Sequence, residues 1–218
     1  MHKLTVDDIL VEGQRVLARV DFNVPLAAGK VADDNRIRAA LPTIRTILER
    51  GGRLVLMSHL GRPKGQPLPE LSLRPCALAL QDLLQQPVTF VDDCVGLAAE
   101  ASVDLLNDGE VLLLENLRYH KEETANDPAF AAQLAALGDV YVNDAFGTAH
   151  RAHASTEGVT HHIAQCAAGY LLMKEIEYLD RVIEAPPKPF VAVLGGAKIS
   201  GKIDVIAHLQ DKVDPVSY

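Results

Sequence analysis

Four arginines of this sequence lie beside the ends of apolar segments or at the start of an amphipathic one: Arg36, Arg62, Arg118 and Arg151. The planar guanidinium group binds phosphate or carboxylate through two parallel hydrogen bonds. Three histidines are placed in the same way: His59, His150 and His153. Residues of these types, brought together, could bind a small ligand that carries several negative charges.

A carboxylate and an amide, Asp21 and Asn23, follow the first apolar segment, which begins at Arg15 and is closed by Pro25. Residues two apart in an extended chain point the same way, so both side chains would face the same space beyond the strand. For an isolated Asp-x-Asn, an Asx turn within the loop is the alternative interpretation.

The arginines have alternative partners close by in the sequence. Arg36 could pair with Asp33 or Asp34, and Arg118 could pair with Glu122 or Glu123. Any one arginine is more simply explained by such a structural pair. The whole set on one edge of a sheet favours a multiply charged anionic ligand.

Strands and helices are predicted to alternate along the chain. Short apolar runs of the kind that form buried strands begin at residue 15 and occupy 54–57, 88–91, 110–114, 139–142 and 190–194. Segments with helical spacing cover 37–48, the stretch from about 72, 97–105, 127–137, 170–183 and 199–209. This alternation predicts an α/β fold with a mainly parallel, doubly wound sheet. The carboxyl ends of parallel strands lie along one edge, where the polar residues that follow them should converge.

Two stretches near the start of the chain are less regular. Residues 26–30 are interpreted as a turn. Pro42 interrupts the apolar pattern of the first helix. That helix should therefore kink there, or start later than the capping residues 33–35 indicate.

The composition excludes several classes of function. The net charge of −8 and the pI of about 5.4 argue against binding to nucleic acid or to a membrane surface. Cys76, Cys94 and Cys166 are far apart and lack C-x-x-C spacing, so we expect buried thiols and no disulfide or zinc role. The histidines also lack metal-ligand spacing, and no residue is assigned as a metal ligand. With no signal peptide or long apolar run, the sequence predicts a soluble, cytoplasmic protein.

A second candidate site is the predicted strand-to-helix turn at residues 195–202, which contains Lys198 and Lys202. Backbone N–H groups at the start of a helix attract phosphate, and the two lysines would share one helix face. A P-loop would need Ser or Thr at the position of Ile203, so that motif fails where it should bind magnesium. A glycine-rich connection without a ligand is the alternative.

Together these stretches resemble the phosphoglycerate kinase family. The matching motifs are RVDFNVP at 19–25, SHLGRP at 58–63, LENLR at 114–118, the run 141–153 and GGAK at 195–198. They occur in the family's order and cover the chain to about Asp214. The resemblance implies a Rossmann-like N-terminal domain that binds 3-phosphoglycerate, and a C-terminal domain that binds MgADP or MgATP.

The resemblance also implies roles for individual residues. Those that would hold the substrate are Asp21, Phe22, Asn23, Arg36, His59, Leu60, Gly61, Arg62, Arg118 and Arg151, with His150 nearby. Those that would contact the nucleotide are Gly195, Gly196, Ala197, Lys198 and Lys202. Arg36 and Lys202 would stabilise the transferring phosphoryl group. Gly201 stands where some relatives carry an aspartate, so the resemblance assigns no magnesium ligand.

The implied reaction is the glycolytic, reversible transfer of a phosphoryl group between 1,3-bisphosphoglycerate and ADP, which depends mainly on positioning and charge neutralisation. Members of the family are longer and monomeric. We therefore expect a truncated kinase: a substrate domain at 1–170, an interdomain helix and Pro-rich linker at 171–187, and an incomplete nucleotide domain at 188–218. Such a chain should bind substrate, turn over negligibly alone, and be able to associate through its unpaired last strand.

Two other functions remain open at this point. A non-catalytic protein that binds phosphorylated metabolites would need the same cluster of arginines. A P-loop nucleotidase would use the second site, and Ile203 argues against it. The kinase predicts binding of 3-phosphoglycerate, whereas the nucleotidase predicts binding of MgADP alone.

Overall fold

The structure, a computed structural model, describes residues 3–184, 186–193, 207, 209 and 212–214. Contacts within the chain divide it into two units, Met1–Met173 and Lys174–Tyr218. The first unit carries the sheet that the sequence predicts. Among the described residues, no helix is both long enough and apolar enough to span a membrane.

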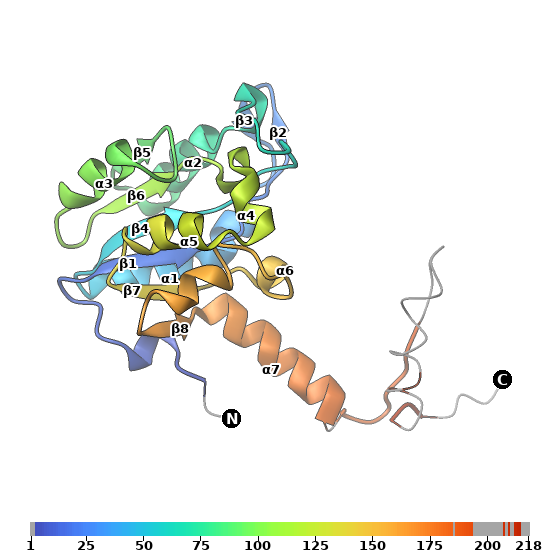
Figure 1. The fold of residues 1–218 in the computed structure, drawn as a ribbon. Coiled ribbons are helices and arrows are strands. Elements are labelled where there is room, and N and C mark those ends of the chain that lie inside the picture. Colours follow the sequence, from blue (N-terminus) through green and yellow to red (C-terminus); the bar gives the residue numbers. More distant parts are fainter. Residues whose placement is uncertain (1–2, 185, 194–206, 208, 210–211, 215–218) are drawn as a thin grey trace. The chain divides into compact units, whose positions relative to one another are not determined.

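Six strands of the described chain form one sheet, and every neighbouring pair in it is parallel (Figure 1). In spatial order the strands are β5 (Val88–Val91), β6 (Val111–Leu114), β4 (Arg53–Met57), β1 (Arg15–Arg19), β7 (Val140–Asn143) and β8 (Cys166–Ala168). The chain leaves β1 towards β4 and leaves β7 towards β8, so the winding direction changes between β1 and β7. Ligands of open α/β sheets bind beyond the strand ends at such a switch point.

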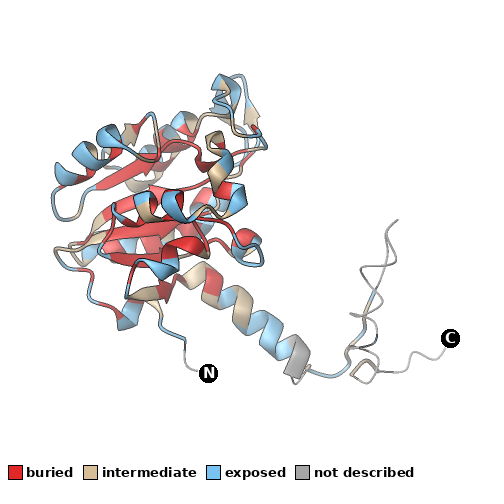
Figure 2. Cartoon of the chain, in the orientation of Figure 1, coloured by how far each residue is buried: buried red, intermediate tan, exposed pale blue. Residues whose placement is uncertain are grey.

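Helices cover both faces of the sheet because alternate strand residues point to opposite sides. Val16 and Ala18 pack with α1 (Asn35–Glu49) and α2 (Arg74–Leu84), whereas Leu17 packs on the other side with α3 (Leu97–Asp104) and α5 (Pro128–Ala135). The four central strands β6, β4, β1 and β7 are almost wholly buried between these two layers, whereas only Val91 is buried in the edge strand β5 (Figure 2). The α/β, doubly wound, mainly parallel fold is thus confirmed.

Shorter elements connect the strands at the edge where the polar residues lie. The hairpin strands β2 (Leu26–Ala27) and β3 (Lys30–Val31) follow β1, and η2 (Pro69–Leu71) follows β4. The remaining short elements are η1 (Val6–Asp8), η3 (Leu117–Tyr119), α4 (Lys121–Ala125), α6 (Phe146–Ala149) and η4 (Gly158–His161). The stretch interpreted as a turn at 26–30 is therefore a small hairpin. Its two central residues, Ala28 and Gly29, both have positive φ, as hairpin turns of this length require.

In the first unit, the structure excludes one of the two alternatives for the first helix and adds a strand that was not predicted. Helix α1 does not start late: it begins at Asn35, whose backbone N–H donates to Asp33, and continues past the exposed Pro42. Strand β8 is not predicted by the local sequence. A Cys-Ala-Ala segment has little strand propensity, and it is a strand here because it pairs with residues 141–143 of β7.

The long helix predicted at 170–183 is α7 (Tyr170–Glu184). Its first turn is anchored in the first unit, where the backbone N–H of Leu172 donates to the buried carboxylate of Asp144 at 3.1 Å. Burial raises the pKa of Asp144. A carboxylate at a helix N-terminus is a favourable cap because it accepts from otherwise unpaired N–H groups.

The strand predicted at 190–194 is wrong for residues 190–193, which are not in a strand. A strand requires a hydrogen-bonded neighbour, and none of the described strands pairs with this segment. The backbone N–H of Phe190 instead donates to the carboxylate of Asp214 at 2.6 Å, and Val193 is 92% exposed. Leu194 and most of the predicted helix at 199–209 lie outside the described residues.

Candidate functional site

The polar residues that follow β1, β4 and β7 meet at the switch point of the sheet. They line a cavity of about 240 Å³. Its walls are formed by Asp21, Asn23, Arg36, His59, Gly61, Arg62, Arg118, Gly147, Thr148 and Arg151. Convergence at the sheet edge, predicted from the order of the elements, is confirmed for Asp21, Asn23, His59 and the four arginines.

The loop after β1 shows that both interpretations of Asp21 and Asn23 hold together. The backbone N–H of Asn23 donates to Asp21 Oδ1 at 3.2 Å, as in an Asx turn. The remaining oxygens are still used at the cavity: Asp21 forms an ion pair with Arg36, and Asn23 Oδ1 accepts from the Gly61 backbone N–H at 2.9 Å. Arg36 is therefore paired with Asp21, while Asp34 pairs with Arg38.

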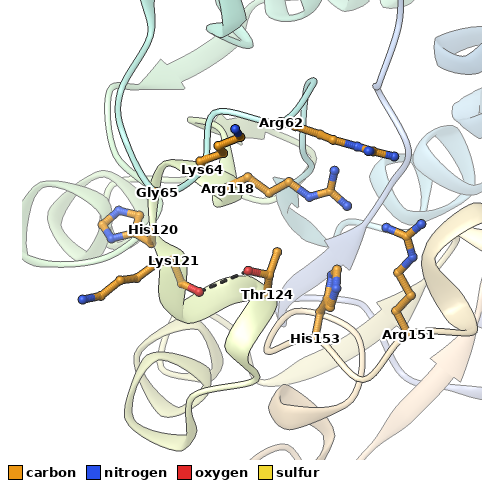
Figure 3. A pocket seen from close by; sticks show the side chains of 9 residues that line it. All are labelled: Arg62, Lys64, Gly65, Arg118, His120, Lys121, Thr124, Arg151 and His153. Atoms are coloured by element: carbon orange, nitrogen blue, oxygen red, sulfur yellow. Dashed lines mark hydrogen bonds between the residues drawn. The ribbon is translucent and has the colours of Figure 1, made fainter.

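Arg62, Arg118 and Arg151 come from three separate loops and extend their guanidinium groups into the same space (Figure 3). They also line an adjoining cavity of about 400 Å³. Arg118 is 8% exposed, and its Nη1 donates to the carbonyl of Gly61 at 3.0 Å. Its Nε is buried without a hydrogen-bond partner among the described residues. Burial, and then the positive charges of Arg19 and Arg151, lower the pKa of Arg118.

Behind the cavity, a chain of buried polar groups supports His59. Arg19, which is completely buried at the end of β1, donates from Nε to Ser155 Oγ at 2.9 Å. Ser155 Oγ in turn donates to Glu123 Oε1 at 2.6 Å. Through Nη2, Arg19 lies 2.9 Å from Nδ1 of His59. Residues from β1, α4 and two loops are thus joined behind the cavity, and this network holds the His59 ring in one orientation.

This contact determines the protonation state of His59. A guanidinium N–H can only donate, so Nδ1 must accept, and the neutral ring carries its hydrogen on Nε2. Burial, followed by the positive charges of Arg19 and Arg118, lowers the pKa of His59 to about 2. His59 is therefore a neutral hydrogen-bond donor in a cavity whose positive charge comes from arginine.

A pH titration of stability tests this state. The unfolded chain takes up a proton at His59 near pH 6.5, and the folded chain does not, so the free energy of unfolding falls as the pH drops. The expected loss from His59 between pH 7 and pH 5 is about 2 kcal/mol, from about 1.4 kcal/mol per pH unit below its unfolded pKa. His59→Gln, which can still accept from Arg19, should remove this component. The exposed His162 provides the control, and an equal flattening in His162→Gln would contradict the assignment.

The structure separates the predicted substrate residues into two groups. The side chains of Phe22 and Leu60 lie in the hydrophobic core, so they do not face a ligand in the cavity. The Phe22 N–H donates to Ser58 Oγ, and the Leu60 carbonyl accepts from Asn116 Nδ2. His150 does not line either cavity and instead accepts from Arg151 Nε at 3.2 Å. All the other predicted substrate residues line the cavity.

Several cavity residues were not predicted. Gly147 and Thr148 belong to the run after β7, and their place directly after the strand could have indicated them. The adjoining cavity adds Lys64, Gly65, His120, Lys121 and Thr124, and it also contains His153, which the sequence analysis had named (Figure 3). Lys64 and Gly65 lie in the loop after β4, whereas His120, Lys121 and Thr124 lie in α4 or immediately before it. No local pattern predicts that these two segments approach each other.

The predicted nucleotide residues lie outside the described residues: Gly195, Gly196, Ala197, Lys198 and Lys202. The structure therefore provides no geometry for them, and the prediction of a phosphate-binding turn stays a prediction.

Comparison with known proteins gives a consistent result. The family profile for phosphoglycerate kinase matches residues 6–217. The phosphoglycerate kinase of Chlorobium luteolum is 59% identical over 217 residues, and that of Chloroherpeton thalassium is 60% identical over 216 residues. Each match covers 99% of this chain but only 55% and 54% of the relative, so the chain spans about half the length of these curated relatives.

Solved structures agree with these sequence matches. Phosphoglycerate kinase from Coxiella burnetii superposes with a TM-score of 0.86 at 41% identity, covering 98% of this chain and 53% of the other. The enzyme from Pyrococcus horikoshii superposes with a TM-score of 0.85 at 34% identity, covering 96% and 53%.

Proposed function

Because this chain belongs to the phosphoglycerate kinase family, we propose that its cavity binds 3-phosphoglycerate or 1,3-bisphosphoglycerate. The whole protein would transfer a phosphoryl group reversibly between the bisphosphate and ADP, in glycolysis and in the cytoplasm. The observation that carries the proposal is the convergence of four arginines on a cavity of about 240 Å³ in an acidic protein.

The cavity walls suit the parts of this substrate. Arg62, Arg118 and Arg151 extend into one space and provide charge-assisted donors for the phosphate group. Asp21 and Asn23, on the opposite loop, provide oxygen acceptors for the hydroxyl group. The Nε2–H of His59 adds a neutral donor, whose protonation does not change near neutral pH.

Phosphoryl transfer would then occur beside Arg36. In the ion pair between Arg36 and Asp21, the arginine has the more exposed side chain. We assign Arg36 to the neutralisation of charge on the transferring group, together with Lys202. MgADP or MgATP would be held by Lys198, Lys202 and the glycine-rich turn that begins at Gly195. Transfer of this kind needs little covalent chemistry from the protein, so positioned positive charge is the main requirement.

We further propose a division of the chain into a substrate domain at 1–170, a connecting segment at 171–187, and part of a nucleotide domain at 188–218. In this proposal the 218-residue polypeptide binds 3-phosphoglycerate, and it turns over negligibly alone. No nucleic acid or membrane partner is part of the proposal.

Calorimetric titration with 3-phosphoglycerate tests the cavity. Arg62→Ala or Arg151→Ala should each weaken binding by about 1.5–3 kcal/mol, since each removes hydrogen bonds to a charged group. That loss corresponds to an increase in Kd of roughly tenfold to a hundredfold. Arg45→Ala is the matched control, because exposed Arg45 on α1 donates to the carbonyl of Leu83 and lines neither cavity.

The three variants together decide the matter. Unchanged affinity in both Arg62→Ala and Arg151→Ala would refute the anion site. Binding of MgADP without binding of 3-phosphoglycerate would instead favour a nucleotidase. Far-ultraviolet circular dichroism of each variant establishes that it is folded before titration.

A further inference from the structure

Three potential metal ligands meet beside the arginine-lined cavity: Asp93, Cys94 and His120. The first two directly follow β5, and His120 follows η3 beyond the end of β6. Since β5 and β6 are neighbouring parallel strands, the loops at their carboxyl ends are brought together. The carboxylate oxygen, the thiol sulfur and the imidazole nitrogen all lie within 4.8 Å of one another.

The surroundings hold two of the three ligands in place. His120 Nε2 lies 2.7 Å from Asp93 Oδ1, which also accepts from the Cys94 backbone N–H at 2.7 Å. The His120 ring packs against Phe130 with a centroid distance of 5.1 Å. The side chains of His120 and Asp93 are 30% and 49% exposed, so an ion could reach the cluster from solvent.

The Cys94 thiol differs from the other two cysteines. The thiols of Cys76 and Cys166 contact the backbone carbonyls of Phe22 and Ile163, at 3.8 and 3.3 Å. In the part of the chain that the structure describes, no such bond joins the Cys94 thiol to another residue, although Cys94 is 1% exposed. A buried sulfur atom thus lies beside an imidazole and a carboxylate without a hydrogen bond of its own to another residue.

Three carboxylates act electrostatically on the Cys94 thiol, those of Asp93, Glu123 and Glu115. The other side of the cluster meets positive charge, because His120 also lines the arginine-rich cavity of about 400 Å³. The negative potential of the three carboxylates, which opposes a thiolate, attracts a positive ion, and an ion bound to sulfur would replace the thiol proton.

We propose that Asp93, Cys94 and His120 form a binding site for a divalent cation of borderline softness, with Zn²⁺ as the best match. One thiolate, one carboxylate and one neutral imidazole neutralise a dication and are the ligand types that zinc takes in proteins. On binding, a metal–sulfur bond forms and the thiol proton leaves to solvent, and metal coordination replaces the hydrogen bond between His120 and Asp93. Water takes the fourth position, and no electron is transferred.

This proposal departs from the expectation that the cysteines have no zinc role. That expectation rested on spacing, and spacing detects ligands that share one local motif. Here His120 lies 26 residues after Cys94 and reaches it only through the pairing of β5 with β6. The proposed site does not depend on the proposed kinase function, since it uses none of the four arginines.

Cobalt titration of the untagged 218-residue chain, in phosphate-free buffer with a non-thiol reductant, tests the site. We expect one Co²⁺ per chain, with a near-ultraviolet thiolate-to-cobalt charge-transfer band that Zn²⁺ abolishes by displacement. Cys94→Ser should lose the band, and His120→Gln should lose it at the same cobalt concentrations. Cys166→Ser, which changes a partly exposed thiol outside the cluster, should retain it.

Two results would overturn the proposal. One is the absence of both the cobalt band and calorimetric Zn²⁺ binding in the unmodified chain. The other is a band that persists in His120→Gln, or that disappears in Cys166→Ser. If Cys94→Ser fails to fold by circular dichroism, His120→Gln decides alone, because its side chain lies at the surface. Neither readout involves catalysis, so failure here is distinct from failure of the proposed kinase function.

Discussion

Replacement of Arg19 by Met should destabilise the first unit by about 3–5 kcal/mol, because it removes a buried cation from a network that contains a buried carboxylate. Arg19 is 0% exposed and is joined to the equally buried Glu123 through Ser155. The variant also removes the donor to His59 Nδ1. Methionine keeps an unbranched side chain of similar length, so the effect comes mainly from lost polar partners.

Arg15→Met provides a matched control on the same strand. Arg15 pairs with Asp139 at 2.7 Å, but both side chains are about a third exposed, so we expect a loss of roughly 1 kcal/mol. Urea denaturation followed by circular dichroism measures both variants. Losses of equal size would show that burial of the network behind His59 contributes no special stability.

The 218-residue polypeptide alone should show no measurable kinase turnover. The chain spans only 55% of the relative from Chlorobium luteolum, and we have proposed that its nucleotide domain is incomplete. Holding two reactants in line lowers a barrier by about 7–11 kcal/mol, a factor of about 10⁵ to 10⁸ in rate, and this requires both binding sites. Binding of 3-phosphoglycerate should persist, since all four arginines of the cavity lie within the first unit.

A coupled assay run beside a full-length relative measures this difference. A turnover rate for the polypeptide within an order of magnitude of the rate for the relative would refute the proposal that the nucleotide domain is incomplete. Calorimetry on the same preparation shows whether the substrate site is intact, so that a misfolded sample is not mistaken for an inactive one.

The sequence alone determined the sheet and the edge on which the site lies. Apolar runs that end in polar clusters recur between helical segments, and this order is enough to predict parallel strands whose carboxyl ends converge. Arg62, Arg118 and Arg151 could therefore be assigned to one site although they are far apart in the chain. Local pattern could do this because each of them lies in the connection that follows a different strand.

The local sequence pattern predicted secondary structure wrongly where a strand depends on pairing with a segment far away in the sequence. Strand β8 has a sequence with little preference for a strand, and pairing with β7 makes it one. Residues 190–193 show the opposite case to β8. Their apolar composition predicts a strand, but they pair with none of the described strands and do not form one. The side chains of Phe22 and Leu60 point into the core. The resemblance to the family implied that these residues belong to the site, but it did not indicate which way their side chains point.

Only the tertiary structure decided the electrostatic state of the site. His59 is neutral because Arg19 faces its Nδ1 and because burial penalises its charged form. The partners of Arg19 in this network, Ser155 and Glu123, lie more than a hundred residues further along the chain. In the same way, Cys94 meets His120 only because β5 and β6 are neighbours. Desolvation and charge depend on everything within a few ångströms, and the sequence order of residues does not contain that information.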